Sequence, residues 1–150
     1  MRNDSRLSRM LHALLHLARS DSPMTSEQMA EMLGTNPVVV RRTMAGMRDA
    51  GYVLSEKGHG GGWSIACDLK KVTLLDIHKA VGGPHIFAIG IETKESNCAV
   101  QKAVNSALKD ALREAEDLLV KRLGCISLSD LLTDFDAHCQ AIPEISKLRK

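Results

Sequence analysis

Hydrophobic residues recur every three or four positions over residues 5–19, the spacing that places them on one face of an α-helix. A polar break follows, and then Thr25 and Gln28 have the spacing of a capping box, in which each side chain bonds the backbone amide of the other residue. The helix that they open ends at Gly34, because glycine readily takes the left-handed conformation found after many helices. The pattern therefore predicts two helices before Thr35.

A third helix is predicted directly after the second. Asn36 can cap it, and Pro37 suits its first position, where the amide proton that proline lacks would have no partner within the helix. The helical spacing continues to Ala50 and stops at Gly51. Two short helices joined by a glycine-containing turn form a candidate helix-turn-helix.

A β-hairpin is predicted next. Residues 52–56 form its first strand, residues 57–62 a glycine-rich turn, and residues 63–66 its second strand. A helix-turn-helix that is followed directly by a hairpin has the element order of a winged helix.

The second half of the chain is dominated by one long helical pattern. Thr73 and Asp76 first cap a short helix over residues 74–81, and residues 85–97 then show no clear period. Residues 98–123 carry an apolar stripe of Val100, Val104, Ala107, Leu108, Ala111, Leu112, Ala115, Leu118 and Leu119. At ~1.5 Å per residue this helix is about 35–40 Å long and exceeds the small domain before it. We therefore expect the stripe to pack against a second copy of the chain.

The C-terminal part is predicted to be helical as well. Gly124 ends the long helix, Ser127 or Ser129 caps a short helix through Phe135, and a charged tail follows. The predicted fold class is mainly α with a small β-hairpin wing: a winged helix-turn-helix plus a long C-terminal dimerisation helix. The expected organisation is a DNA-binding domain over residues 1–81, a connecting or sensor segment over 82–97, and the dimerisation helix with a helical tail over 98–150.

Composition narrows the picture further. Hydrophobic residues make up 44% of the 150 positions, which excludes a disordered chain, and the aromatic share of 3% predicts an aliphatic, methionine-rich core. No apolar run approaches the ~20 residues of a membrane-spanning helix. The N-terminal pattern is that of an amphipathic helix rather than a signal peptide, so we expect a cytoplasmic protein. Residues 1–71 carry 10 Lys and Arg against 7 Asp and Glu, which makes this half slightly basic.

The basic residues of the predicted winged helix point to double-stranded DNA. Asn36, Val38, Arg41 and Arg42 lie on the side of the third helix that is free of core residues. Arginine can pair bidentately with guanine and asparagine with adenine, and valine can touch a thymine methyl. A cation on a slim glycine-rich turn suits the narrow minor groove, and the candidate contacts there are Lys57, Gly58, His59 and Gly60. The alternative is a winged helix used only for protein–protein contacts, with these charges simply solvated.

The segment KGHGGGWSIA, which begins at Lys57, resembles the RGxGGGxxLA wing of the Rrf-two (Rrf2) family of bacterial transcriptional regulators. The preceding NPVVVRRTMAGMRDAGYV is similar to the recognition helix of that family, and VTLLDIHKAV to the helix after its wing, so that the order of elements matches over about residues 5–135. The resemblance implies a homodimeric regulator, usually a repressor, and the two-fold axis of such a dimer predicts an operator that is an imperfect inverted repeat. It also implies that Lys57 occupies the position of a minor-groove arginine and that Arg41 and Arg42 approach bases.

The cysteines do not identify the signal to which such a regulator would respond. Cluster-binding members of the Rrf-two family carry three closely spaced cysteines before the long helix, whereas this chain has Cys98 alone, as in the cluster-free YwnA-type branch. We therefore expect no cofactor. A redox or thiol sensor at Cys98 is one interpretation, since the positive end of a helix stabilises a thiolate, and a structural cysteine is the other. A cluster or metal held by Cys98 with His12 and His16 is a further alternative.

Enzymatic activity has little support in the sequence. The chain contains no GxSxG elbow, no P-loop and no HExxH motif, and its glycine-rich run lies between two strands rather than before a helix. Cys67, Cys125 and Cys139 are scattered and form no pair with metal-ligand spacing. The sequence therefore predicts a regulator and not an enzyme.

Overall fold

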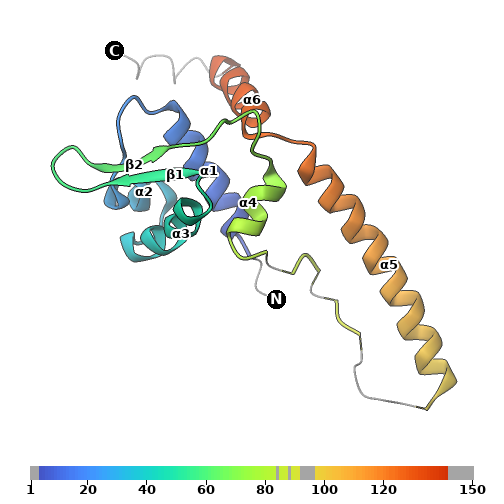
Figure 1. Cartoon of the computed structure of the whole chain (residues 1–150). Coiled ribbons are helices and arrows are strands. Elements are labelled where there is room, and N and C mark those ends of the chain that lie inside the picture. The colour runs from blue at the N-terminus through green and yellow to red at the C-terminus, as the bar shows by residue number, and fades with distance from the viewer. Residues whose placement is uncertain (1–3, 84, 88, 92–96, 142–150) are drawn as a thin grey trace.

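The computed structural model describes residues 4–83, 85–87, 89–91 and 97–141. Its elements in chain order are α1 (Arg6–Arg19), α2 (Ser26–Leu33), α3 (Pro37–Asp49), β1 (Val53–Glu56), β2 (Gly62–Ile65), α4 (Leu74–Ala80), α5 (Ala99–Gly124) and α6 (Leu128–Ala141) (Figure 1). The predicted fold class, mainly helical with one hairpin, is confirmed. Residues 84, 88 and 92–96 of the predicted connecting segment, and the charged tail over 142–150, lie outside the described residues.

Local hydrogen bonds begin the helices where the sequence predicts. Thr25 Oγ1 accepts a hydrogen bond from the Gln28 amide at 3.2 Å, and Gln28 Oε1 accepts one from the Thr25 amide at 2.9 Å. Asn36 Oδ1 accepts from the Val39 amide at 3.0 Å at the start of α3. Gly34, with φ +62°, ends α2 in the left-handed conformation. The two helices of the helix-turn-helix are thus fixed by their own caps.

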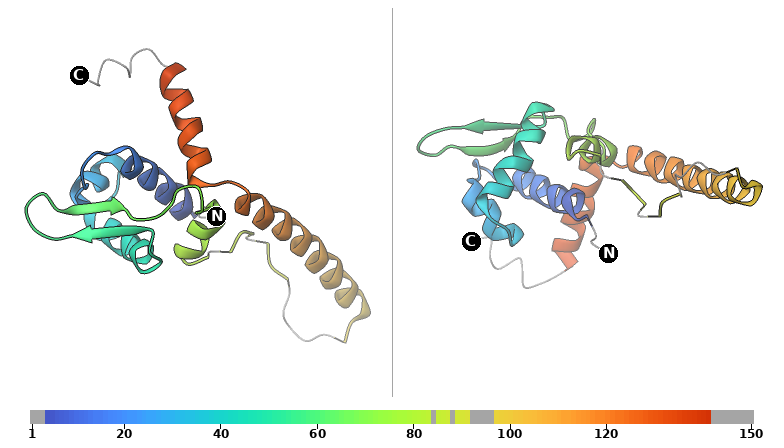
Figure 2. Two further views of the ribbon diagram at one scale, coloured as in Figure 1. Left: turned by 45° about the horizontal axis from the view of Figure 1, so that its top comes forward. Right: turned by 90° about the horizontal axis from the view of Figure 1, so that it is seen from below.

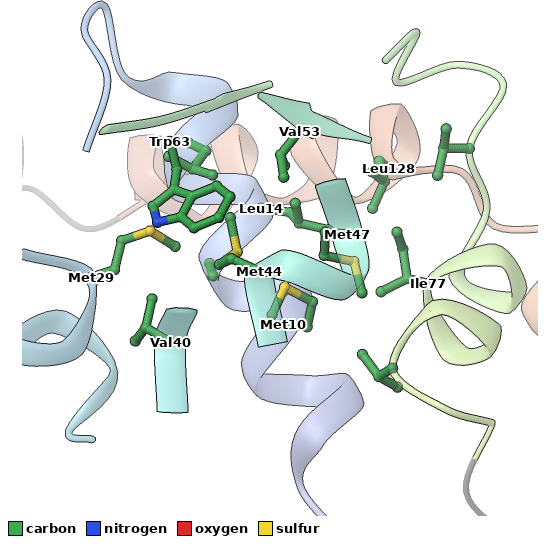
Figure 3. Close-up of a cluster of buried hydrophobic side chains, with 14 of the residues drawn as sticks. Met10, Leu14, Met29, Val40, Met44, Met47, Val53, Trp63, Ile77 and Leu128 are labelled. Carbon is green, nitrogen blue, oxygen red and sulfur yellow. The ribbon is translucent and has the colours of Figure 1, made fainter. Parts of the chain in front are cut away.

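Methionine and leucine side chains from α1 to α4 form one core (Figure 3). Met29, Met44 and Met47 are fully buried, as the small aromatic share predicted. Trp63 is buried beside them, and its indole Nε1 donates a hydrogen bond to Ser26 Oγ at 3.0 Å, so its polar atom is satisfied inside the core. This core holds α3 and the hairpin in one rigid unit.

The hairpin pairs β1 with β2 in antiparallel register, with Val53 opposite Ile65. Strand β1 is one residue shorter than predicted and β2 lies one residue earlier, although Ala66 N still donates to Tyr52 O at 3.0 Å just beyond their ends. Met24 adds a short bridge to the other side of β2 through two hydrogen bonds with Trp63. A Cβ at Gly62 would lie 2.6 Å from Met24 O, so this close approach requires glycine.

Helix α5 contacts α4 near its C-terminal end, where Leu123 packs against the core, and the rest of the helix extends away from the winged helix (Figures 1 and 2). It begins directly after Cys98, as predicted, but includes Gly124 as its last residue rather than stopping before it. None of its residues is buried. The apolar stripe therefore has no partner among the described residues of a single chain.

Helix α6 returns to the winged helix. Of the two serines considered, Ser127 is the cap: its Oγ accepts from the Asp130 amide at 3.1 Å, and Asp130 Oδ2 accepts from the Ser127 amide at 2.8 Å. The helix continues past the predicted end at Phe135. Leu128 is fully buried in the core, and Arg19 Nη1 lies 2.7 Å from Asp136 Oδ1, which ties α6 to α1. The segment after α5 thus completes the core of the winged helix.

Candidate DNA-binding surface

Helix α3 divides into a buried side and an exposed side. Val40, Met44 and Met47 are buried in the core. Val38, with 58% of its surface exposed, and the two arginines Arg41 and Arg42 face solvent. A large apolar side chain exposed one turn before two arginines suits a partner that offers both anionic and apolar contacts, and the phosphates and thymine methyls of DNA provide both.

Arg41 is held by a residue of the preceding helix. Its Nη1 lies 3.2 Å from Oε1 of Glu27, and the two side chains are 53% and 67% exposed. An ion pair between such exposed groups contributes only about 0.2–1 kcal/mol, so Arg41 can leave it at small cost. Arg42 makes no hydrogen bond or ion pair with any described residue. No local pattern predicts this role of Glu27, because it lies 14 positions before Arg41.

Asn36 has a structural duty besides any contact with DNA. Its side-chain oxygen accepts the hydrogen bond that caps α3, and Asn36 itself remains exposed. Its amide NH₂ group points to no described acceptor and can donate to a base or a phosphate. Replacement of Asn36 would therefore disturb both the start of α3 and the surface.

The wing turn projects on the side of the molecule opposite to α5 (Figure 2). Lys57, Gly58, His59 and Gly60 are all exposed at its tip. Gly58 and Gly60 have φ values of +98° and +76°, a region that L side chains rarely adopt. A Cβ at Gly61 would lie 2.3 Å from the carbonyl oxygen of Glu56. The glycines therefore form a narrow, tight turn from which the side chains of Lys57 and His59 project.

One further cation of α3 was missed by the sequence reasoning. Arg48 is exposed near the C-terminal end of the helix, with Nη2 only 3.4 Å from Asp49 Oδ1. Its position could have been found from the helical spacing, since it follows Arg41 by seven residues and thus lies on the same side. Together α3 and the wing present four Arg and Lys side chains: Arg41, Arg42, Arg48 and Lys57.

The candidate sensor and metal residues are far apart in a single chain. Cys98 occupies the position directly before α5, where its side chain makes no capping hydrogen bond, and it is exposed. His12 and His16 lie on α1, which is distant from the start of α5 in both figures. The rings of His12 and His16 are 4.8 Å apart. Burial, followed by the neighbouring charge of His12, lowers the pKa of His16. One copy of the chain does not bring these three residues together.

The other cysteines have different surroundings. Cys125 is exposed after α5, and Cys67 and Cys139 are half-buried. Burial raises the pKa of the Cys67 thiol, which keeps it protonated and unreactive near neutral pH. Among the described residues no three His, Cys, Asp or Glu side chains are grouped to hold a metal ion.

A family model described as "Rrf2: Iron-dependent Transcriptional regulator" matches residues 3–134 of this chain, from α1 through the first half of α6. The chain belongs to the Rrf2 family. It is a DNA-binding transcriptional regulator with a winged-helix fold, and the resemblance stated from the sequence is confirmed.

The relatives agree with this assignment. The HTH-type transcriptional regulator YwnA of Bacillus subtilis is 31% identical over 130 residues, which cover 86% of this chain and 96% of YwnA. A transcriptional regulator from Lactobacillus plantarum has the same fold, with a TM-score of 0.75, 22% identity and coverage of 97% and 99%. The oxidised form of CymR from Staphylococcus aureus superimposes with a TM-score of 0.60 at 19% identity, with coverage of 88% and 96%.

The description of the family mentions iron, and the described residues of one chain do not fit an iron site. An iron–sulfur cluster needs about four ligands, mostly thiolates, whereas Cys98 is the only cysteine near the start of α5. In the part of the chain that the structure describes, every helix is too short or too polar to span a bilayer.

Proposed function

We propose that this Rrf2 regulator is a homodimeric repressor that binds an inverted-repeat operator. The observation that carries the proposal is the exposed surface in which Val38, Arg41 and Arg42 of α3 lie on the same rigid core as the Lys57 wing. In a winged helix, the N-terminal half of the recognition helix enters the major groove. The wing then lies over the adjacent minor groove, where the phosphate potential attracts a cation. The protein acts by binding and catalyses no reaction.

The side chains divide into two roles. Among the described residues, the Arg42 guanidinium has no partner and Arg41 has one exposed ion pair to break, so both are available for bidentate contacts with guanine. Val38 touches a thymine methyl group, and Asn36 donates from its amide. Lys57 and His59 contact the DNA backbone along the minor groove, which the narrow turn formed by Gly58 and Gly60 allows them to approach.

A DNA-binding assay with matched variants tests the surface. Arg42→Ala should weaken binding to a selected operator by about 1–3 kcal/mol and relax the preference at one base pair. Lys57→Ala should weaken binding to operator and random DNA alike, and should reduce the salt slope by about one charge per protomer. Lys109→Ala removes an exposed charge from α5 and should change neither. If the chain binds no duplex at low salt, the winged helix serves protein–protein contacts instead.

The uncovered stripe of α5 supports the dimer. Val100 and Leu118 are 71% and 70% exposed, and Val104 and Leu108 are 50% and 40% exposed. Full burial of such a side chain is worth about 1.5–3 kcal/mol, so water contact at this stripe is a large unfavourable term for the isolated chain. A second α5 packed against the stripe removes this contact with water. A two-fold dimer then places two α3 helices on two half-sites about 34 Å apart.

Sedimentation of a charge variant tests the dimer. Leu108→Asp would bury a carboxylate against the partner helix, which costs far more than a lost leucine contact. The variant should sediment as a monomer and lose tight operator binding. The control Lys109→Asp changes the neighbouring exposed residue. A folded dimer of Leu108→Asp at micromolar concentration would place the interface elsewhere.

Cys98 is the sensing thiol in this proposal. It is exposed at the first position before α5, so an adduct on it would displace the helix that sets the distance between the two α3 helices. An oxidised structure exists for the CymR relative, which shares this fold. Cys98→Ser should bind the operator as the reduced protein does and ignore peroxide, while Cys125→Ser, the other exposed cysteine, should still respond. If Cys98→Ser loses binding at the same peroxide dose as the parent, Cys98 is structural.

The sensor works without a cluster in this proposal. The single cysteine near the start of α5 supports this, as does the separation of Cys98 from His12 and His16 in one chain. The visible absorption spectrum of the anaerobically purified protein tests it. An iron–sulfur absorption band that disappears in Cys98→Ser, His12→Gln or His16→Gln would show a cluster shared between protomers and overturn the proposal.

A further inference from the structure

A cavity of about 360 Å³ lies behind α3, between this helix and α1, α2 and the end of α4. Its floor is formed by buried apolar side chains of three helices: Met10, Ala13, Met29, Val40 and Met44. This volume falls within the ~300–1,000 Å³ range of small-molecule sites, which are mostly apolar with a few polar groups at defined places. The cavity lies on the flank of α3, adjacent to the side that carries Val38 and Arg41.

The mouth of the cavity is positively charged. Arg6, Arg9 and Arg42 line it, and no Asp or Glu is among the lining residues. Arg6 is already neutralised, since its Nη2 lies 2.7 Å from Asp4 Oδ2, and its Nη1 donates to Val81 O at 3.2 Å. Among the described residues, the Arg9 guanidinium donates only to Ser5 Oγ, at 3.3 Å, and the Arg42 guanidinium has no partner. Within the described part of the chain, two guanidinium groups at the mouth therefore lack a negative partner.

We propose that this cavity binds a small amphipathic carboxylate, with its apolar body among the methionines and its carboxylate between Arg9 and Arg42. The methionine floor adapts to aliphatic or aromatic shapes, because methionine side chains are unbranched and polarizable. A guanidinium group matches a carboxylate in geometry and charge, which selects the anionic end of the ligand. An alcohol or an amine of equal length could still place its chain among the methionines but would lack the carboxylate that pairs with the two arginines.

The ligand would oppose DNA binding. Arg42 lines the cavity and also belongs to the surface proposed to contact bases, so a carboxylate that engages Arg42 withdraws it from DNA. By linkage, DNA must then weaken the binding of the carboxylate by the same factor. This step rests on the proposed function, whereas the binding of the carboxylate itself does not.

Titration of the full-length protein without DNA tests the site. The probes are straight-chain carboxylates from butanoate to decanoate. Their binding is measured by isothermal calorimetry and by the fluorescence of Trp63. This single tryptophan shares the buried cluster with Met29 and Met44 (Figure 3). Affinity should rise about fourfold per added methylene until the cavity is full, because a buried CH₂ contributes about 0.8 kcal/mol and 1.4 kcal/mol is tenfold. Octanol and octylamine should bind at least tenfold more weakly than octanoate. Equal affinity for all three compounds would refute the charged mouth.

Two variants locate the binding. Arg9→Gln, at a half-exposed position, should weaken the binding of octanoate about tenfold, and Val39→Phe should abolish it by filling the cavity. Arg113→Gln removes an equal charge from α5 and should leave the affinity unchanged. Octanoate binding that survives Arg9→Gln and a folded Val39→Phe would place the ligand elsewhere and overturn the proposal.

A competition experiment separates this proposal from the proposed function. Octanoate at saturating concentration should weaken operator binding by the parent protein and leave that of Val39→Phe unaffected. A failure of octanoate to bind the DNA-free protein refutes the cavity ligand and leaves the DNA-binding surface intact. Octanoate that binds without changing DNA affinity retains the site and refutes the competition through Arg42.

Discussion

Glu27→Gln is expected to increase the affinity for DNA. In the free protein, Glu27 Oε1 accepts a hydrogen bond from Arg41 Nη1 at 3.2 Å, and Arg41 must leave this pair to reach a base. Because both side chains are more than half exposed, the pair is worth only about 0.2–1 kcal/mol. At 1.4 kcal/mol per tenfold, its removal should tighten operator binding by a factor of about 1.4 to 5.

A double-mutant cycle isolates this effect from a general change in charge. Removal of one carboxylate near DNA also reduces repulsion from the phosphates, and this part should be the same with or without Arg41. Fluorescence anisotropy on operator and random duplexes would therefore compare Glu27→Gln in the parent and in Arg41→Ala. The gain on operator DNA should be larger in the parent.

Two outcomes would refute this reasoning. Equal gains in the parent and in Arg41→Ala would show that the ion pair does not restrain Arg41. A loss of affinity in Glu27→Gln would mean that the carboxylate itself contacts DNA, for example by accepting from a cytosine amino group.

Two further predictions concern stability. Leu128→Ala, at a fully buried position, should lower the free energy of unfolding measured in urea by about 2–5 kcal/mol. The control Leu54→Ala, at a position 55% exposed, should change this free energy by less than about 0.5 kcal/mol. Similar effects of the two substitutions would contradict the docking of α6 in the core. Because burial lowers the pKa of His16 below its unfolded value of about 6.5, the unfolded state binds this proton first, so stability should fall as pH drops below about 6.5. His16→Gln should flatten this part of the urea-stability profile between pH 7.5 and 5.5, with His12 and the Arg19–Asp136 pair left in place nearby; an unchanged slope would exclude His16 as its source.

Features set by neighbours in sequence were predictable. The caps at Thr25, Asn36 and Thr73 act over three residues, and each appears where its spacing indicates. The two sides of α3 follow from helical periodicity, so Arg41 and Arg42 were placed on the exposed side from the sequence. Local hydrogen bonds and periodicity carry this information within a single stretch of chain.

Features that join distant stretches were not predictable. Leu128 is buried where its amide donates a hydrogen bond to Val72 O, 56 positions earlier, and the pattern of α6 alone does not identify this partner. The pair of Arg41 with Glu27 depends on how α2 and α3 cross. The cavity between four helices depends on the shapes of their side chains together. Such contacts are set by tertiary packing and leave no periodic signal.

The burial of Leu128 also constrains the order of events during synthesis. Chains emerge from the ribosome at about 5–20 residues per second, and N-terminal segments fold first when they can. Here the core of the winged helix lacks one of its fully buried leucines until α5 has been made and Leu128 has followed it. A nascent chain that ends within α5 is thus less stable than the finished one, so the DNA-reading part reaches full stability only after the helix proposed to pair the protomers has been translated.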